Sequence, residues 1–297
     1  MDRPHCRGRR ARARGHRPHP NSCRGCDLVS ASPTDPRIDP FSVDIDGTTL
    51  RGSVFRADAA HAGPRPVAVF FHGFGGTRVE ASRMFVAQAR RLTAAGITVV
   101  TYDRAGHGES DGEFLDTTAS GDIRTAHRVL EVVRALPGVD GDDLHLLGMS
   151  LGAVIASVVA AEQQSTRPVR SLTMWSTAAV FVDEIRSGHL QGMPLDTLDT
   201  VAWFDFHGMR LGPAMRADAV AFDPYGRAAA FAGPALLLHG TDDFIPRTYA
   251  ERYAAQEVFG DRAEVVVVEG ADHGWEQLPQ RDELHDRTTA FITAHAG

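Results

Sequence analysis

Short apolar runs alternate with amphipathic stretches from Phe41 to the end of the chain, and this alternation limits the possible folds more than any other feature. Six runs are apolar over most of their length, at 65–73, 97–103, 144–149, 169–176, 234–240 and 263–270. Five further stretches repeat apolar residues at helical spacing, at 79–95, 121–136, 151–164, 247–259 and 280–295. Strands that are apolar throughout are buried on both faces, as in parallel sheets covered by helices. The sequence therefore predicts an α/β fold, with a mainly parallel sheet and helices on both faces.

The regular pattern opens with a hairpin. Residues 41–57 alternate apolar and polar side chains on either side of Asp46-Gly47, a dipeptide typical of tight hairpin turns. We therefore expect an antiparallel hairpin at the start of the sheet.

Residues 1–40 differ sharply from the rest of the chain. The first 28 hold eight arginines, three histidines and two acids, and apolar side chains are scarce. Such a segment cannot bury enough surface to offset the entropy that is lost on ordering. The sequence predicts a disordered arginine-rich tail at 1–40, followed by one domain at 41–297. An alternative interpretation is that translation starts near Val29.

All three cysteines, Cys6, Cys23 and Cys26, lie in this tail. The last two have the C-x-x-C spacing of zinc sites, and three histidines are close in sequence. A second C-x-x-C pair is missing, however, and so are the apolar residues that would form a small domain around a metal ion. We therefore expect no metal site.

The composition is that of an ordinary globular protein, with 43% hydrophobic and 23% charged residues. A net charge of -7 argues against a surface that binds nucleic acid. No stretch approaches the roughly 20 apolar residues of a membrane span, and the N-terminus lacks the apolar core of a secretory signal. We expect a cytoplasmic protein that binds neither nucleic acid nor membrane, and the composition does not bear on its oligomeric state.

The section 176–233 breaks the alternation of strands and helices. It holds mixed helical fragments and three of the seven methionines, but no clear buried strand. Because a structureless loop of this length is rare in a compact domain, we expect an inserted cap of short helices over the active face. Its apolar residues are available to line a pocket, although we expect more than half of them only to pack the cap: Phe181, Met193, Trp203, Phe204, Phe206, Met209 and Met215.

Polar residues follow three of the expected strands, at positions that would meet at one edge of the sheet. Ser150 follows the run 144–149, while Asp243 and His273 come after the last two runs. Ligands of such sheets bind beyond the carboxyl ends of the strands. A serine hydroxyl becomes a nucleophile when a histidine takes its proton, and an acid orients that histidine. The sequence therefore predicts a catalytic triad of Ser150, His273 and Asp243.

This chemistry also needs two backbone N–H donors for the negative charge that develops on the substrate oxygen. Leu151 would supply one at the start of a helix, directly after Ser150. Phe74 would supply the other, in a glycine-rich loop after the first buried strand. Gly148 and Gly152 flank Ser150 at the G-x-S-x-G spacing of a sharp strand-to-helix turn. We predict an oxyanion hole formed by the N–H groups of Phe74 and Leu151.

Taken together, these motifs resemble those of the α/β-hydrolase superfamily. The matching stretches are GMSLG (148–152), HGFGG (72–76), YDRAGHGESDG (102–112), HGTDDFIP (239–246) and VEGADHGW (268–275). They resemble the nucleophile elbow, the oxyanion loop, a common Asp-x-x-Gly-x-Gly-x-Ser loop, and the acid and histidine loops. The resemblance covers about 41–297 and is strongest to bacterial cinnamoyl and feruloyl esterases and to serine aminopeptidase-like hydrolases. It implies hydrolysis of a small-molecule carboxylic ester, with a small to medium acyl or aryl-acyl group, through an acyl-serine and without a cofactor.

Several neighbouring residues have alternative interpretations. Asp242 is the alternative to Asp243. The resemblance implies Asp243, because the acid of these hydrolases usually lies four residues after the strand-end histidine, here His239, and it leaves Asp242 a turn or capping role. Asp272 is interpreted as an acid that fixes its loop. His72 and His107 precede glycines in turn motifs, so we expect them to hydrogen-bond backbone groups.

Two other functions are compatible with the same residues. An aminopeptidase or other amide hydrolase of this fold would need acids in the cap to bind a free amino group, and five are available: Asp183, Glu184, Asp196, Asp199 and Asp205. A non-catalytic binding protein is disfavoured, because such proteins tend to lose a triad residue and none is missing here.

Overall fold

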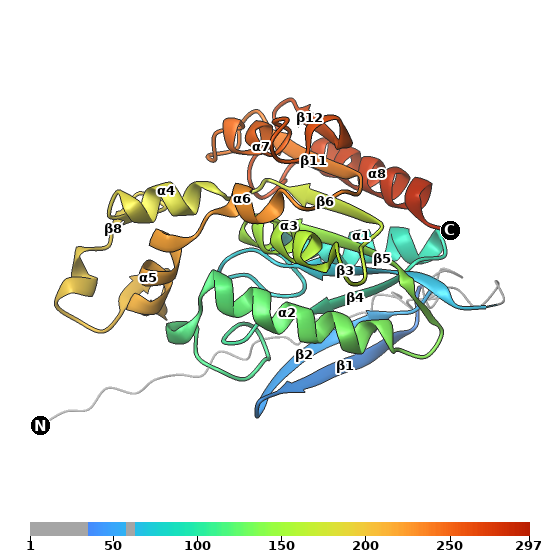
Figure 1. Ribbon diagram of the computed structural model, residues 1–297, viewed down its shortest axis with the longest axis horizontal. Helices are drawn as coiled ribbons and strands as arrows, with labels where there is room; N and C mark the ends of the chain where they lie inside the picture. Colours follow the sequence, from blue (N-terminus) through green and yellow to red (C-terminus); the bar gives the residue numbers. More distant parts are fainter. Residues whose placement is uncertain (1–34, 58–62) are drawn as a thin grey trace, which may run out of the picture. The chain divides into compact units, whose positions relative to one another are not determined.

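An eight-stranded sheet lies at the centre of the computed structural model, which describes residues 35–57 and 63–297 (Figure 1). The strands are β1 (Ile38–Ile45), β2 (Thr48–Phe55), β3 (Arg65–Phe71), β4 (Thr98–Tyr102), β5 (Val139–Met149), β6 (Ser171–Trp175), β11 (Ala235–Gly240) and β12 (Ala263–Val268). Their order is β1-β2-β4-β3-β5-β6-β11-β12. Strand β2 is antiparallel to both of its neighbours, whereas all pairs from β4 to β12 are parallel. The predicted mainly parallel sheet with an N-terminal antiparallel hairpin is confirmed.

Helices cover both faces of this sheet, as predicted. On one face lie α2 (Ala119–Arg134) and α3 (Leu151–Gln163), and on the other lie α1 (Met84–Ala94) and α8 (Leu278–His295). Strand β3 shows why both faces must be covered, because its apolar side chains alternate between the two cores. Val67 and Val69 belong to the core under α2 and α3, while Ala68 and Phe70 belong to the core under α1 and α8.

The first strand begins earlier than expected. Residues 38–40, which were predicted to belong to the disordered tail, pair with residues 53–55 of β2. Arg56 donates from Nε to Asp39 Oδ2 at 2.9 Å, which ties this stretch to the end of β2. Pro40 fits because β1 is an edge strand, where a missing N–H costs nothing. Residues 1–34, with all three cysteines, lie outside the described residues, so the predictions for them stay predictions.

Two of the expected helices are shorter than their apolar spacing suggested. Helix α1 starts at Met84 instead of residue 79, after a 3-10 turn at Ala81–Arg83. The preceding residues cannot be helical because Glu80 has a φ of 58° and its carboxylate accepts from the Gly73 N–H. Helix α7 (Thr248–Tyr253) ends well before residue 259.

The segment between β6 and β11, which we call the cap (176–233), is more varied than the cap of short helices that we expected. It contains α4 (Val180–Arg186), α5 (Pro213–Ala221), α6 (Pro224–Ala228), a 3-10 turn (Asp196–Asp199) and two antiparallel ribbons, β7 (His189–Leu190) with β8 (Met193–Pro194) and β9 (Phe204–Phe206) with β10 (Met209–Leu211). Figure 1 shows these elements in yellow to orange beside one end of the sheet.

Two dipeptides form the turns that connect the strands of each ribbon in the cap. Gln191-Gly192 and His207-Gly208 all have positive φ values, the geometry of tight type I′ hairpin turns. The expectation of helices alone was wrong because each strand is only two or three residues long and has too few positions to display a period.

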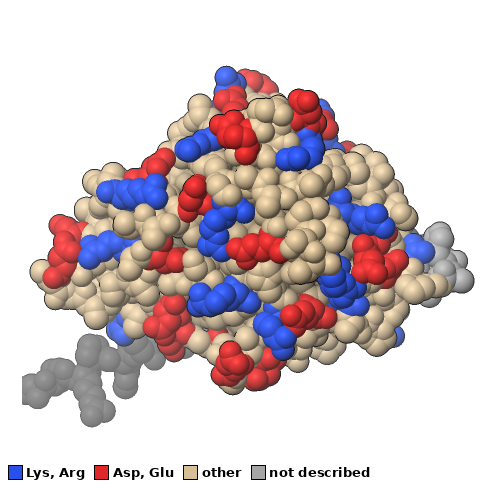
Figure 2. Space-filling model, viewed as in Figure 1, with Lys and Arg blue, Asp and Glu red and all other residues tan. Residues whose placement is uncertain are grey.

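The surface carries both signs of charge in close mixture. On the face shown in Figure 2, basic and acidic side chains are interspersed. Ion pairs between surface side chains include that of Arg91 with Asp282, at 2.7 Å. Among the described residues, no helix is long and apolar enough to cross a membrane.

Candidate active site

Ser150 occupies a strained turn between β5 and α3. Its φ of 56° and ψ of −121° lie outside the regions that most residues adopt. The two flanking glycines make this turn possible. A Cβ atom on Gly148 would lie 2.3 Å from the carbonyl oxygen of Gly152, and one on Gly152 would lie 2.0 Å from that of Phe71. Larger residues at either position would push α3 away from the sheet and move Ser150 with it.

His273 lies between Ser150 and Asp243, so the structure brings together the three residues predicted as a triad. Its Nε2 is 3.1 Å from Ser150 Oγ. Its Nδ1 is 2.9 Å from Oδ1 and 3.1 Å from Oδ2 of Asp243. Both distances are within hydrogen-bonding range. The residues come from three separate strand ends, those of β5, β11 and β12, which meet because the strands are parallel.

The Asp243 carboxylate is fully buried and well anchored. It accepts a hydrogen bond from the Ile245 N–H at 2.8 Å in addition to those from His273. Burial alone raises the pKa of Asp243, but the hydrogen bond and charge of His273 and the Ile245 N–H outweigh burial, so the net pKa lies below its ordinary value. An ionised Asp243 places the imidazole proton on Nδ1, which leaves Nε2 free to accept from the Ser150 hydroxyl.

Leu151 directly follows Ser150 in the chain, and Phe74 lies in the glycine-rich loop after β3. Leu151 is the first residue of α3, where N–H groups have no partner within the helix. Within the described residues, neither N–H donates to another protein group. Both residues line the cavity that holds Ser150. The N-terminus of a helix also favours negative charge, so this position suits an oxyanion.

The structure distinguishes Asp243 from its neighbour Asp242 and from Asp272, which precedes His273 in the chain. Asp242 is exposed and accepts from Thr241 Oγ1 at 3.0 Å. Asp272 accepts from the Glu276 N–H at 2.9 Å and so fixes its loop, as expected. Asp243 alone of these three pairs with the His273 ring.

His72 and His107 bond to backbone groups, as predicted. His72 Nδ1 is 2.9 Å from the Gly73 carbonyl oxygen, and His107 Nδ1 is 2.9 Å from that of Ala105. Burial and the charge of Arg104 hold the pKa of His72 well below its ordinary value, so this ring is neutral.

Glu80 was not predicted as part of the site, because the apolar spacing placed it inside a helix. Its carboxylate accepts from the N–H groups of Gly73 and Ala81. Burial raises the pKa of Glu80 by more than these hydrogen bonds lower it. The Glu80 carboxylate therefore anchors the glycine-rich loop through the Gly73 N–H.

A small, mostly apolar cavity of about 30 Å³ adjoins Ser150. Its walls combine residues of the glycine-rich loop, the elbow, the cap and the acid loop: Phe74, Ser150, Leu151, Ala178, Val180, Phe181, Glu184, Leu190, Gln191, Met215, Phe244 and Ile245. Of the seven apolar cap residues considered from the sequence, Phe181 and Met215 line it. Phe244 is 62% exposed and its ring lies 4.4 Å from that of His273.

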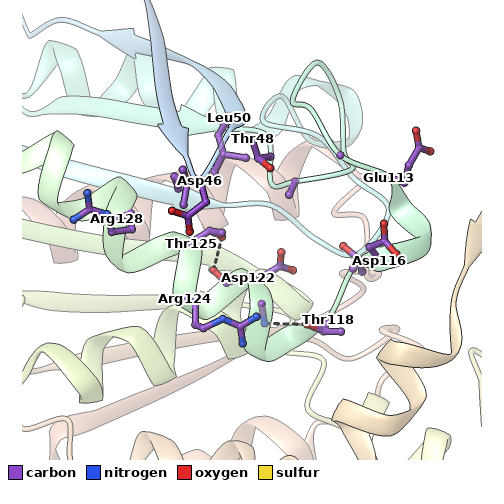
Figure 3. Close-up of a pocket in the computed structure, with 15 residues that line it drawn as sticks. Asp46, Thr48, Leu50, Glu113, Asp116, Thr118, Asp122, Arg124, Thr125 and Arg128 are labelled. Atoms are coloured by element: carbon purple, nitrogen blue, oxygen red, sulfur yellow. Dashed lines mark hydrogen bonds between the residues drawn. The ribbon is translucent and has the colours of Figure 1, made fainter.

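A much larger cavity, of about 540 Å³, lies elsewhere, between the β1–β2 turn and the start of α2 (Figure 3). Asp46, Asp116 and Arg124 are among its lining residues, whereas Ser150 and His273 are not. This cavity was not predicted from the sequence, and its size alone does not mark it as the reactive site.

A second Ser-His-Asp arrangement is present and was also not predicted. His145 Nδ1 is 2.7 Å from Ser171 Oγ, and His145 Nε2 is 3.1 Å from Asp143 Oδ1. Ser171 and His145 are fully buried in β6 and β5. No substrate can reach this serine, so the hydrogen-bond pattern alone does not make a site.

A parallel sheet with one antiparallel strand, and a serine on a strand–turn–helix elbow at its edge, define the α/β-hydrolase fold. The family model described as "Alpha/beta hydrolase family" matches residues 68–287. The chain belongs to this family.

Similar proteins include a lipase. A monoacylglycerol lipase of Mycolicibacterium smegmatis is 25% identical over 260 residues, which cover 78% of this chain and 89% of that protein. An uncharacterized protein of Mycobacterium tuberculosis is 26% identical over 252 residues, covering 84% and 77%. The structure of Est1E from Butyrivibrio proteoclasticus with bound ferulic acid superposes with a TM-score of 0.77 at 22% identity, covering 86% and 98% of the two chains. The family and the monoacylglycerol lipase support a hydrolase, and the Est1E structure supports the fold.

Proposed function

We propose that this protein is a serine hydrolase that cleaves carboxylic esters through an acyl-serine intermediate. One observation carries the proposal. His273 lies within hydrogen-bonding distance of both Ser150 Oγ, at 3.1 Å, and the buried Asp243 carboxylate, at 2.9 Å. This is the geometry that a nucleophile, its general base and an orienting acid require.

In the first half of the reaction, Ser150 Oγ attacks the ester carbonyl carbon while His273 Nε2 takes the hydroxyl proton. The carbonyl oxygen becomes an oxyanion, which accepts hydrogen bonds from the N–H groups of Phe74 and Leu151. Asp243 stabilises the imidazolium that forms. The intermediate then collapses, the C–O bond to the alcohol breaks, and His273 returns the proton to the leaving alcohol.

In the second half, water attacks the acyl group on Ser150 and gives its proton to His273. Collapse of the second tetrahedral intermediate releases the carboxylic acid and restores the serine hydroxyl. The residues named supply the nucleophile, the base and the donors, so the proposed cycle uses no metal ion and no organic cofactor.

The lining of the cavity supports small to medium acyl or aryl-acyl groups as substrates. Apolar side chains from both the cap and the acid loop surround Ser150, including Phe181, Met215 and Phe244. A volume of about 30 Å³ is below the few hundred Å³ of typical ligand sites. We therefore propose that short acyl chains react best and that larger aryl-acyl groups, feruloyl among them, need the cap or Phe244 to shift.

Glu184 supports a second candidate, an aminopeptidase. It is the one acid of the five considered in the cap that lines the cavity at Ser150, although it also accepts from the Gln191 N–H at 2.8 Å. Asp199 and Asp205 are engaged elsewhere, with Arg216 at 2.9 Å and with the Gly208 N–H at 2.7 Å. A single carboxylate near the nucleophile is a weaker basis for binding an amino group than the cluster considered from the sequence.

Initial rates on p-nitrophenyl acetate, p-nitrophenyl butyrate, methyl ferulate and an amino-acyl p-nitroanilide test the proposal. We expect turnover of the esters, no activity of Ser150→Ala on any of them, and near-normal activity of a Ser171→Ala control that folds. Turnover of the anilide alone, abolished by Glu184→Gln, would favour the aminopeptidase. Absence of all turnover, together with no fluorophosphonate adduct on Ser150, would favour a non-catalytic binding protein.

A further inference from the structure

Arg104 is a fully buried arginine that contacts the glycine-rich loop. It follows β4, and its guanidinium donates from Nη1 to Asp122 Oδ2 on α2 and from Nη2 to the carbonyl oxygen of Gly73, at 2.7 Å. The catalytic steps proposed above do not use this buried ion pair. Burying two charges costs free energy, so this pair needs an explanation beyond the stability of the fold.

The carbonyl that Arg104 holds belongs to the peptide unit of the oxyanion donor. Gly73 C=O and Phe74 N–H are the two ends of one planar trans peptide group, so they point in opposite directions. Because Arg104 holds the Gly73 oxygen toward the protein interior, the Phe74 N–H is directed the other way, toward the cavity that Phe74 shares with Ser150.

Two further donors converge on the same oxygen. The Arg104 N–H donates to His72 Nε2 at 3.0 Å, so the neutral His72 ring carries its proton on Nδ1, which lies 2.9 Å from the Gly73 oxygen. The Gly76 N–H also donates to this oxygen, at 3.1 Å. Donors on a carbonyl polarise its peptide group and strengthen the hydrogen bond that the opposite N–H can give.

We propose that Arg104, held in place by Asp122, is a positioning residue of the oxyanion hole: it fixes and polarises the Gly73–Phe74 peptide so that the Phe74 N–H meets the developing oxyanion. The inference rests on the proposed function, because it needs a tetrahedral intermediate on Ser150. It differs from a purely structural ion pair in one respect. A structural pair affects the stability of the fold, whereas a positioning residue also affects the binding of the transition state.

The test compares the wild type with the double variant Arg104→Met/Asp122→Leu. This variant removes the hydrogen bond to Gly73 without leaving an unpaired charge buried, so it is the change most compatible with folding. Arg104→Lys is the second variant, because it keeps the charge but lacks the two-pronged geometry of a guanidinium. Each variant is assayed for kcat and KM with p-nitrophenyl butyrate, and for inhibition by a trifluoromethyl ketone that forms a tetrahedral oxyanion adduct.

Arg134→Met is the matched control. Arg134 is also buried, and its guanidinium also donates to backbone carbonyl oxygens, those of Gly141 and Arg167. Gly141 lies near the start of β5 and Arg167 lies before β6, at the end of the sheet opposite to Ser150. The control therefore has the same type of contact without the link to the oxyanion donor, and we expect it to change the melting temperature but neither kcat nor ketone inhibition.

For the double variant we expect kcat to fall by about 10- to 100-fold with KM within about twofold of the wild type, since loss of a complete donor costs about 100- to 1,000-fold. The inhibition constant of the ketone should rise by the same factor as kcat/KM falls. Both values for Arg104→Lys should lie between those of the wild type and the double variant. A folded variant whose kcat and ketone inhibition equal those of the wild type overturns the inference, as does a rise of KM alone. If the double variant does not fold, the same measurements on Arg104→Lys test the inference: a fall in kcat with weaker ketone inhibition supports it, and wild-type values or a rise of KM alone overturn it. A wild type that turns over no ester refutes the proposed function instead, so the two failures are distinguishable.

Discussion

Replacing Asp243 by asparagine tests the electrostatic part of the proposed mechanism. When His273 takes the Ser150 proton, an imidazolium forms 2.9 Å from Asp243 Oδ1. At an effective dielectric constant of about 20, Coulomb's law gives roughly 6 kcal/mol for unit charges at this distance, an upper limit because both charges are spread over two atoms. A loss of this size corresponds to about 10⁴-fold in rate. We expect kcat/KM of Asp243→Asn for p-nitrophenyl butyrate to fall by about 10³- to 10⁴-fold, with little change in KM.

The matched control is Asp242→Asn, which removes the neighbouring carboxylate. Asp242 is exposed and bonds to Thr241 instead of His273, so this variant should retain activity within about threefold. The reasoning is refuted if Asp243→Asn keeps more than about a tenth of wild-type activity while Ser150→Ala is inactive. It is refuted equally if Asp242→Asn is the more damaged of the two.

Three further predictions concern the framework of the site. In Gly152→Ala, the new Cβ would lie 2.0 Å from the Phe71 carbonyl oxygen, so we expect a loss of about 1–3 kcal/mol in the free energy of urea unfolding and at least about 100-fold in kcat; an active and equally stable variant would contradict the close packing of the elbow. Burial holds the pKa of Glu80 above its ordinary value of 4.5. The protonated residue therefore stabilises the native state fully below pH 4.5, and this stabilisation is lost as the pH rises through the native pKa. In urea unfolding, the free energy of unfolding of Glu80→Gln relative to that of the wild type should therefore be higher at pH 7 than at pH 4. A lower relative value at pH 7 would show that the native state stabilises Glu80 as the anion. The single variants Arg104→Met and Asp122→Leu should each lose about 3–5 kcal/mol, whereas the double variant should lose less than either, and additive losses would argue against a coupled pair.

The sheet and the grouping of Ser150, Asp243 and His273 could be predicted from the sequence for one physical reason. Parallel strands all end at the same edge of the sheet, so residues that directly follow β5, β11 and β12 must lie close together even though they are far apart in the chain. Apolar runs mark those strands clearly, and the glycines on either side of Ser150 mark the turn that follows one of them.

The contacts of Arg104 and Glu80 with the oxyanion loop could not be predicted, because they join residues that are far apart in the sequence. Arg104 reaches back 31 residues to Gly73 and forward 18 residues to Asp122, and no periodic pattern encodes such pairs. Glu80 was placed in a helix because the apolar spacing from residue 79 fits one, whereas its φ of 58° is not helical and its carboxylate accepts from the Gly73 N–H. Tertiary hydrogen bonds outweighed local propensity at this position.

The cap (176–233) was the least predictable part for a different reason. Its ribbons have strands of two or three residues, and such strands show no alternation that could be distinguished from a short helix. The glycine-containing turns at 191–192 and 207–208 were the available signal, and they indicate hairpins only once both residues are known to have positive φ.

The most direct test of the central claim is to trap the acyl-enzyme and find its position. The protein is mixed with p-nitrophenyl acetate, quenched in acid within the first turnovers, and analysed by intact mass spectrometry and peptide mapping. The mechanism predicts a burst of one p-nitrophenol per chain and a single added acetyl group, located on Ser150 and missing in Ser150→Ala. Ester turnover without any acyl adduct in the wild type, or with an adduct that persists in Ser150→Ala, would contradict it.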